Sequence, residues 1–530
     1  MPGRPNQNDR RSWWGVFGLL VLVGTLWAVA TPPVTGPDEV EQARRAAAVV
    51  RGDLIGARQP DVPPLVVDVR VPQTYGEASV DHWRCFLGPL VDGSPQQAMP
   101  LPPSTCPELS SSRSITTVQT VQYRGQPFFY AWVGLGTLWP GPFGTYLMRF
   151  LSILPVAALL ATAAVSARRT GRGRLAGLAV ACVITPMVMY LAGSTNPSAL
   201  EVAAAACAWT TGMVLADRRA TPSGRTVASF GVALVVLSLT RGLGPLFSGY
   251  LVVAVAAVAG WRRIVELAKR RDLQIWAGAV VVAVGLSGAW LAHLQSDYAL
   301  PPRPGTGWHH ALDYLPWYLR QTVGVFGTND SALSSPVSTI WVAAAGGVLV
   351  AGLWRSSWAA RAVALATLVV GLAMQVTAEG LSLPPIGFFW QGRYALPILV
   401  GAVLVSAVSP RRPSPDQDSE PVRGPLSNEL GLAAELAVWA IGGVLVVVQT
   451  AAFLTVLRHY TAEGPGSLRL SDAVFHPTWA PPLWPLVLVV AYVGAIGSTV
   501  VLLLRSTDDR PVGSALVLSV PEEPLVSTPT

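Results

Sequence analysis

Two adjacent carboxylates, Asp38 and Glu39, follow closely on an apolar run near residues 12–30. A carboxylate beside apolar surroundings can deprotonate an acceptor hydroxyl group, or it can hold a divalent cation such as Mg²⁺ or Mn²⁺ beside a phosphate. The stretch also has a local explanation, because Asp38 can cap a helix and Glu41 can complete a D-x-x-E variant of the capping box. This explanation leaves Glu39 and the nearness of the apolar run unaccounted for.

Other ionisable residues share one property, which is a position at or near the predicted outer end of an apolar run. They are Glu201, Arg241, His293, Asp330, Glu379 and Arg393. Charge is expensive inside a bilayer, so this distribution predicts a polar site at the outer membrane face. A secondary transporter usually builds its site near the midplane, so the pattern favours an enzyme that acts on a lipid-linked substrate. An outward-open vestibule of a transporter would give a similar pattern.

Several polar residues have a local explanation beside the functional one. Arg393, with Tyr394 beside it, fits either phosphate binding by the planar guanidinium fork or snorkelling in an interfacial aromatic belt. Four others are ordinary helix caps or turn formers, with ligand binding as the alternative: Asn196, Ser198, Asn329 and Asp330.

The composition places the chain in the integral-membrane class, because 51% of its residues are hydrophobic and only 13% are charged. The formal net charge is +7. The Arg residues form short clusters between apolar runs instead of one basic stripe, so they indicate topology and no nucleic-acid partner.

About twelve apolar runs reach or approach the roughly 20 residues that a membrane helix needs. They lie near residues 12–30, 142–166, 174–192, 197–216, 226–240, 243–260, 273–294, 337–354, 359–378, 391–409, 430–456 and 483–504. The two runs within 226–260 form either a helical hairpin or one bent helix. Since Lys and Arg prefer the cytoplasmic side, the alternating clusters predict a multi-pass protein of the cytoplasmic membrane with both termini inside.

The sequence thus predicts an all-α integral membrane protein. Its parts are a cytoplasmic N-terminus (1–11), a polytopic core (12–405), a cytoplasmic linker (406–429), C-terminal membrane helices (430–504) and a flexible cytoplasmic tail (505–530). The external loop 31–127 is rich in Pro, Gly and Ser, and we expect one or two helices in it instead of a sheet. The aromatic segment 126–142 is too short to span a membrane and is expected at the outer interface.

Four cysteines divide between two environments. Cys85 and Cys106 lie in the external loop, where oxidation is permitted, and a disulfide between them would contribute about 3 kcal/mol by restricting the unfolded loop. Cys182 and Cys207 lie inside apolar runs, where they are expected to act as small apolar fillers.

Four stretches carry a resemblance to a known family: PPVTGPDEVEQARRAAAVVRGDLIG after the first run, GSTNPSALE (193–201), SLTRGLGP (238–245) and FFWQGRYALPI (388–398). Together they resemble domain-of-unknown-function family 2142, a group of often actinobacterial multi-pass membrane proteins that is distantly similar to the glycosyltransferase C superfamily. The resemblance runs from about residue 12 to residue 405.

The resemblance implies a polytopic helical enzyme with an outward-facing site that transfers a sugar from a polyprenyl-phosphate donor. Asp38 and Glu39 fill the acidic position of the first external loop, while Arg393, Tyr394 and Arg241 would face the donor phosphate. The expected activity is inverting hexosyl or pentosyl transfer to a glycan or glycolipid acceptor in cell-envelope assembly. The alternative is a non-enzymatic protein, either a flippase for a lipid-linked glycan or an assembly partner.

Overall fold

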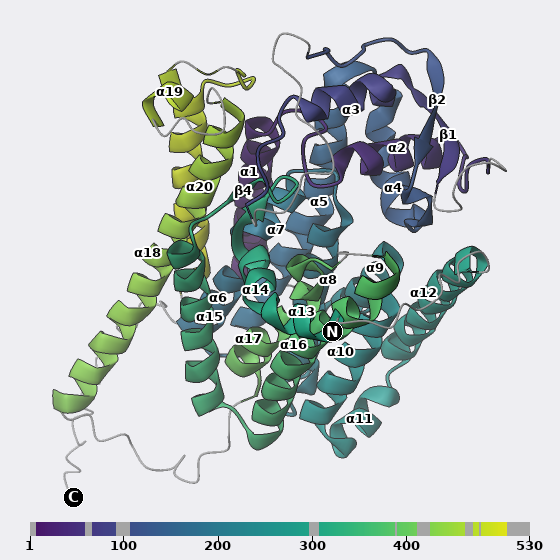
Figure 1. The fold of residues 1–530 in the computed structure, drawn as a ribbon. Coiled ribbons are helices and arrows are strands. Elements are labelled where there is room, and N and C mark those ends of the chain that lie inside the picture. The colour runs from purple at the N-terminus through teal and green to yellow at the C-terminus, as the bar shows by residue number, and fades with distance from the viewer. Residues whose placement is uncertain are drawn as a thin grey trace, which may run out of the picture.

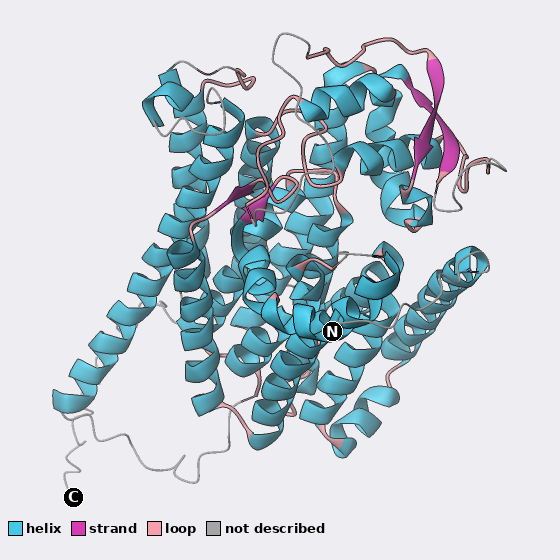
Figure 2. Ribbon diagram, viewed as in Figure 1, coloured by secondary structure: helices cyan, strands magenta, loops and turns pink. Residues whose placement is uncertain are grey.

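The computed structural model describes residues 7–58, 66–91, 106–295, 307–386, 390–410, 425–461, 470–475, 477 and 479–505. It shows a bundle of long helices with a smaller domain at one end (Figures 1 and 2). Helices dominate the described chain, and its strands form two small two-stranded sheets. The predicted all-α fold class is therefore confirmed. Most of the predicted linker 406–429 and all but the first residue of the tail 505–530 lie outside the described residues.

The bundle is built from helices that follow the predicted apolar runs. They are α1 (Gln7–Ala30), α5 (Gly141–Arg168), α6 (Arg174–Val183), α7 (Pro186–Ala192), α8 (Pro197–Ala216), α9 (Gly224–Thr240), α10 (Gly244–Ala259), α11 (Trp261–Ala268), α12 (Arg271–Gln295), α15 (Ser335–Arg355), α16 (Trp358–Ile386), α17 (Leu396–Val408), α18 (Pro425–Thr461) and α20 (Pro485–Leu504).

By length and composition, 8 described helices could cross a membrane, or up to 10 if each bent helix pair forms one span. The bent pairs are α6 with α7, at 58°, and α10 with α11, at 115°. Each predicted apolar run contains a helix, although α9 and the helix over Gly392–Val408 are shorter, at 10–17 residues.

The region 226–260 forms a helical hairpin. Helices α9 and α10 are separate, pack against each other and are joined by the Ser238 to Ser248 hydroxyl hydrogen bond of 2.9 Å. The turn is tight at Gly244, where an added Cβ would lie 2.0 Å from the carbonyl oxygen of Leu237. A glycine is therefore required there for the two helices to approach.

Helix α8 lies at the centre of the bundle and determines where the polar residues at its N-terminal end are placed. Every residue of α8 is buried, and the helix contacts α5, α9, α10 and α17. Its Ala203–Ala206 stretch presents small side chains that let neighbouring backbones come close. The N-terminal end of α8 lies next to the start of the smaller domain, because Asn196 there donates to the carbonyl of Pro37.

The smaller domain combines α2 (Glu39–Val50), α3 (Glu77–Arg84) and a two-stranded antiparallel sheet (Figure 2). The sheet pairs β1 (Val67–Pro72) with β2 (Ile115–Thr120). The prediction of one or two helices agrees with α2 and α3, but the expectation of no sheet is wrong. The two strands lie far apart along the chain. At alternate positions of β1, Val67, Val69 and Val71 all point into the core, and β1 contacts α2.

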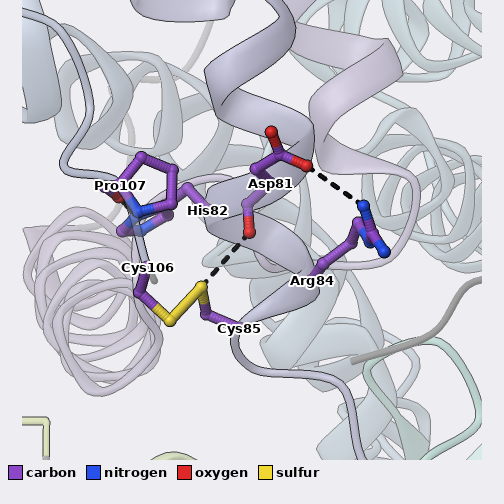
Figure 3. The surroundings of a disulfide bond; sticks show 6 residues. All are labelled: Asp81, His82, Arg84, Cys85, Cys106 and Pro107. Carbon is purple, nitrogen blue, oxygen red and sulfur yellow. Dashed lines mark hydrogen bonds and ion pairs between the residues drawn. A yellow bond between two sulfur atoms is a disulfide. The ribbon is translucent and has the colours of Figure 1, made fainter. Parts of the chain in front are cut away.

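A disulfide joins Cys85, just after α3, to Cys106, as Figure 3 shows. Next to it, the sulfur of Cys85 lies 3.2 Å from the carbonyl oxygen of Asp81, and the side chain of Asp81 pairs with Arg84 at 3.2 Å. The disulfide ties the segment before β2 to the end of α3 within the smaller domain.

The aromatic segment 126–142 forms two short helical turns, α4 (Pro127–Val133) and a 3₁₀ turn over Gly134–Leu138, instead of a span. Phe129, Tyr130 and Val133 face inward. The opposite side exposes large apolar side chains: Phe128, Trp132, Leu135, Leu138 and Trp139. Such a face suits the interfacial location that the sequence predicts.

Shorter elements complete the described chain. They are α13 (Gly307–Asp313), α14 (Leu315–Gly324), the strand pair β3 (Val325–Phe326) and β4 (Ser331–Ala332), α19 (Leu470–Phe475) and 3₁₀ turns over Gln73–Tyr75, Gln122–Arg124 and Gly392–Ala395. Glu435, a carboxylate within the long helix α18, forms an ion pair with Arg174 of α6, which compensates its charge.

Candidate functional site

Glu39 is buried in an ion pair that holds the base of the smaller domain to the bundle. Its carboxylate oxygens lie 2.6 and 2.8 Å from Nη2 and Nε of Arg149 in α5, and both side chains are 0% exposed. The backbone N–H groups of Gly36 and Thr195 also donate to Glu39, at 3.0 and 2.9 Å. Arg149 completes its bonds with three backbone carbonyls at the end of α1 and just after it.

The charge of Glu39 is therefore fully compensated. Burial alone would raise the pKa of its carboxyl, but the attraction of Arg149 and the hydrogen bonds from Arg149, Thr195 and Gly36 outweigh burial and lower the pKa. A carboxylate with all its bonds made inside the protein has no access to a substrate. Of the two acidic residues predicted at the site, Glu39 is enclosed with Arg149, and only Asp38 is half-exposed.

Asp38 lies one residue earlier but points to a different partner. Its carboxylate accepts a hydrogen bond of 2.9 Å from Nη2 of Arg393, and its side chain is 48% exposed. Asp38 adopts the left-handed conformation (φ 58°), which is uncommon for a residue with a side chain. This backbone turn directs Asp38 away from α2 and toward Arg393.

The predicted capping box is absent as a result. The Asp38 side chain makes no cap hydrogen bond, although the residue occupies the N-cap position of α2. Glu41 accepts instead from the hydroxyl of Thr120 at 2.6 Å and pairs with Arg44 at 3.3 Å. Glu41 therefore joins α2 to the β2 strand.

Arg393 comes from the 3₁₀ turn that leads into α17, and its side chain is almost fully buried. Among the described residues its Nε has no hydrogen-bond partner. The turn is fixed by Gly392, whose N–H donates to Oε1 of Gln321 at 2.6 Å. An added Cβ at Gly392 would lie 1.9 Å from the carbonyl oxygen of Tyr318, so only glycine fits.

Arg241, in the turn between α9 and α10, forms the next part of the site. Its guanidinium lies 4.2 Å from the centre of the Tyr394 ring, a cation–π contact. It also donates to the Ser198 hydroxyl at 2.9 Å and lies 3.5 Å from Oε2 of Glu201. Two arginines, Arg241 and Arg393, thus flank Tyr394, because Arg393 also lies 5.5 Å from that ring centre.

Asn196 connects the centre of the bundle to the segment that carries Asp38. Its side-chain oxygen caps α8 by accepting from the N–H of Ser198 at 3.0 Å, and its amide nitrogen donates to the carbonyl of Pro37 at 3.1 Å. The capping interpretation is confirmed for Asn196. Ser198, by contrast, uses its hydroxyl to hold Arg241.

Asn329 and Asp330 form a turn in a separate network. Asn329 adopts a left-handed conformation (φ 67°), and Asp330 accepts from the N–H of Thr328 at 3.1 Å. The other oxygen of Asp330 accepts from the N–H of Gly88 at 3.1 Å and lies 3.5 Å from Nε2 of His459. The turn-former interpretation is confirmed, and Asp330 joins the smaller domain to α18.

The structure therefore brings together Asp38, Arg393, Tyr394, Arg241, Ser198 and Glu201, which we call the outer site. Sequence reasoning missed Arg149, the partner of Glu39. The same signal that revealed the other residues, a charge close to the end of an apolar run, applies to Arg149 near the start of the run 142–166.

The fold and the site define a class of protein. It is a helical membrane protein that carries two arginines and one half-exposed carboxylate at one end of its bundle. Residues 20–402 match the family model described as "Predicted membrane protein (DUF2142)", and the chain belongs to this family.

No curated protein matches the chain. Two solved structures show a distant likeness, both of ArnT from Cupriavidus metallidurans. The apo structure gives a TM-score of 0.43 at 16% identity and covers 93% of this chain and 77% of that one. The structure bound to undecaprenyl phosphate gives 0.44 at 16% identity, with 94% and 78% covered.

Proposed function

We propose that this protein is a membrane glycosyltransferase that uses a polyprenyl-phosphate-linked sugar donor at the outer face of the cytoplasmic membrane, in the assembly of envelope glycans or glycolipids. The observation that carries the proposal is the pair of Asp38 and Arg393. It places a half-exposed carboxylate against a buried guanidinium, at the end of the bundle that carries the smaller domain.

Arg393 is suited to a phosphate because one side of its fork remains available. Nη2 is bonded to Asp38, while the buried Nε has no partner among the described residues. A guanidinium binds phosphate through parallel N–H groups, and Arg241 adds a second positive charge across Tyr394. A phosphate bound by Arg393 would compete with Asp38 for the guanidinium. Donor binding therefore weakens the ion pair of Asp38 and frees its carboxylate.

The freed carboxylate has a chemical task in sugar transfer. The acceptor oxygen attacks the anomeric carbon, the bond from that carbon to the phosphate oxygen breaks, and the polyprenyl phosphate leaves with the bonding electrons. Asp38 takes the proton of the attacking hydroxyl, and Arg393 and Arg241 stabilise the leaving phosphate. Attack opposite the leaving group inverts the anomeric carbon.

A divalent cation is an optional part of this proposal. Mg²⁺ is commonly held by one or two carboxylates together with phosphate oxygens. Asp38 would supply that carboxylate at the outer site, and the cation would add positive charge at the phosphate. Glu201 is already occupied near Arg241, and Glu39 is enclosed with Arg149.

The test is a gene deletion complemented with wild type, with Asp38→Asn and with Asp81→Asn, at matched membrane abundance. Asp81 is a fitting control because it is also 48% exposed and paired with an arginine, but on α3. We expect one envelope glycan to disappear in the deletion, to return with wild type and Asp81→Asn, and to stay absent with Asp38→Asn. Full restoration by Asp38→Asn would contradict the proposal. Carrier movement in proteoliposomes without transfer would favour the flippase.

A further inference from the structure

A second group of buried polar side chains lies within α16, and the proposed transfer chemistry does not use it. Gln375 and Glu379 are four residues apart, so they lie on one face of this helix, and both are 0% exposed. Polar side chains within a span are costly and usually mark a functional site. Here two of them lie one turn apart in a helix that is mostly apolar.

Gln375 has no partner for its amide among the residues that the structure describes. Neither its Nε2 nor its Oε1 makes a hydrogen bond. The buried Gln449 of α18 shows the ordinary arrangement, since its Nε2 donates to the carbonyl of Ile184 at 2.6 Å and its Oε1 accepts from the hydroxyl of Tyr492 at 2.8 Å. Because buried amides are nearly always bonded, Gln375 points to a group that binds there.

Aromatic residues lie beside the carboxylate of Glu379, one turn from this amide. Glu379 accepts from the backbone N–H of Trp390 at 2.7 Å, and the phenol of Tyr318 lies beside Glu379. Trp390 and Tyr318 belong to a small apolar cluster separate from the main core, with Tyr314 against it. The indole Nε1 of Trp390 is a further buried donor without a partner among the described residues.

The group lies next to the outer site, because one short segment contributes to both. Trp390 begins this segment, and Arg393, three residues later, binds Asp38. The ring of Trp390 lies 5.4 Å from that of Tyr394, at 85°, and Tyr394 in turn lies under Arg241. If Arg393 and Arg241 hold the phosphate of a ligand, a sugar ring attached to that phosphate can therefore reach Trp390.

We infer that Gln375, Glu379, Tyr318 and Trp390, which we call the Gln375 group, bind the hydroxyl groups of a neutral sugar ring. The inference rests on the proposed function and names the part of the substrate that the outer site leaves unassigned. The Gln375 group offers donors at Gln375 and at the indole of Trp390 and an acceptor at the Gln375 amide oxygen. Adjacent sugar hydroxyls, which both donate and accept, match that mixture. Aromatic faces cover the apolar C–H side of such a ring, whereas Glu379 would repel a phosphate.

The test uses the full-length protein in lipid nanodiscs. We would compare the affinity for undecaprenyl phosphate with the affinities for undecaprenyl phosphate linked to glucose, galactose, mannose or arabinose, and then for the free methyl glycosides of the same sugars. We expect at least one sugar-linked carrier to bind roughly tenfold tighter than the bare carrier. Gln375→Leu should abolish this ratio and leave binding of the bare carrier and the unfolding temperature unchanged.

The matched control is Gln449→Leu, which removes an amide with both partners in place. It should lower the unfolding temperature and keep the ratio. If instead Gln375 is required for the binding of methyl glycosides but not for the ratio, the bound ring belongs to the acceptor and the inference holds. The inference is overturned if the protein shows neither tighter binding of a sugar-linked carrier nor binding of a methyl glycoside. It is also overturned if Gln375→Leu leaves both kinds of sugar binding unchanged.

The same experiment separates this inference from the proposed function. Asp38→Asn should keep the binding ratio while losing transfer. A protein that shows the Gln375-dependent ratio but transfers no sugar would contradict the glycosyltransferase and leave the sugar site in place.

Discussion

Asp38 and Glu39 are neighbours in the chain, and both form an ion pair with an arginine from a distant helical element, yet their environments are opposite. Glu39 and Arg149 are both 0% exposed and are joined by two short contacts. Asp38 is 48% exposed and accepts one hydrogen bond from Arg393, from Nη2. The left-handed backbone at Asp38 separates the two carboxylates. Adjacent residues of one type can therefore divide structural and chemical roles between them.

The two pairs also differ in energy. Removing one partner of a buried ion pair leaves an uncompensated charge and costs about 3–5 kcal/mol, whereas an exposed pair contributes about 0–1 kcal/mol. The pair of Glu39 and Arg149 is therefore expected to hold the smaller domain on the bundle. The pair of Asp38 and Arg393 lies between these cases, because Arg393 is buried while Asp38 is 48% exposed, so a phosphate that replaces Asp38 can keep the charge of Arg393 compensated.

The largest effect is expected for Arg149→Leu, which leaves the buried Glu39 without its partner. We expect a loss of about 3–5 kcal/mol of folding free energy, seen as low membrane abundance and a lower unfolding temperature. Adding Glu39→Gln to that variant should restore much of the loss. An Arg149→Leu protein as stable as wild type would show that the pair is not structural.

The pH dependence of unfolding comes next. The pKa of Glu39 is lowered from its ordinary 4.5, so its ion pair contributes fully above that value and the contribution is lost as pH falls through the lowered pKa. Each unit of lowering corresponds to about 1.4 kcal/mol. When the pH falls from about 6 to about 3, wild type should lose more stability than Glu39→Gln in detergent unfolding. Parallel curves for the two proteins would contradict this account.

Arg393→Lys tests the open pair by keeping the charge and removing the planar fork. We expect roughly tenfold weaker binding of undecaprenyl phosphate, because Lys cannot bind phosphate through parallel N–H groups. Arg84→Lys, in the exposed pair with Asp81, is the control and should not change this binding. If wild type and Arg393→Lys bind undecaprenyl phosphate with equal affinity, Arg393 does not bind the phosphate.

The smallest effect is expected for Asp38→Asn on stability. The exposed carboxylate contributes about 1 kcal/mol or less, and asparagine tolerates the left-handed conformation as well as aspartate does. The unfolding temperature should therefore stay close to that of wild type. A large drop would mean that Asp38, like Glu39, is mainly structural.

The sequence predicted the helices well because a long apolar run reports burial directly. It also predicted most of the outer site, since charges at the ends of apolar runs have few places to lie except near one another. Asp38, Arg241 and Arg393 were found in this way. The signal is physical and needs no knowledge of tertiary contacts.

Features that depend on distant partners could not be predicted in the same way. The β1–β2 sheet joins two strands that are more than 40 residues apart in the predicted external loop 31–127. The capping box failed because Arg393, far along the chain, draws the Asp38 side chain away from α2. The enclosed state of Glu39 likewise depends on Arg149, a residue of α5.

The central claim is that Asp38 acts chemically while its neighbour is structural. The most direct measurement is the rate of sugar transfer by purified wild type, Asp38→Asn and Asp81→Asn in nanodiscs, with the sugar-linked carrier that binds best. We predict that Asp38→Asn lowers kcat about 100-fold or more while its unfolding temperature stays near that of wild type. Its carrier affinity should stay the same or rise, because the neutral amide of Asp38→Asn competes less than the carboxylate of Asp38 for the guanidinium of Arg393. Asp81→Asn should match wild type. An Asp38→Asn enzyme with an undiminished kcat would contradict the account.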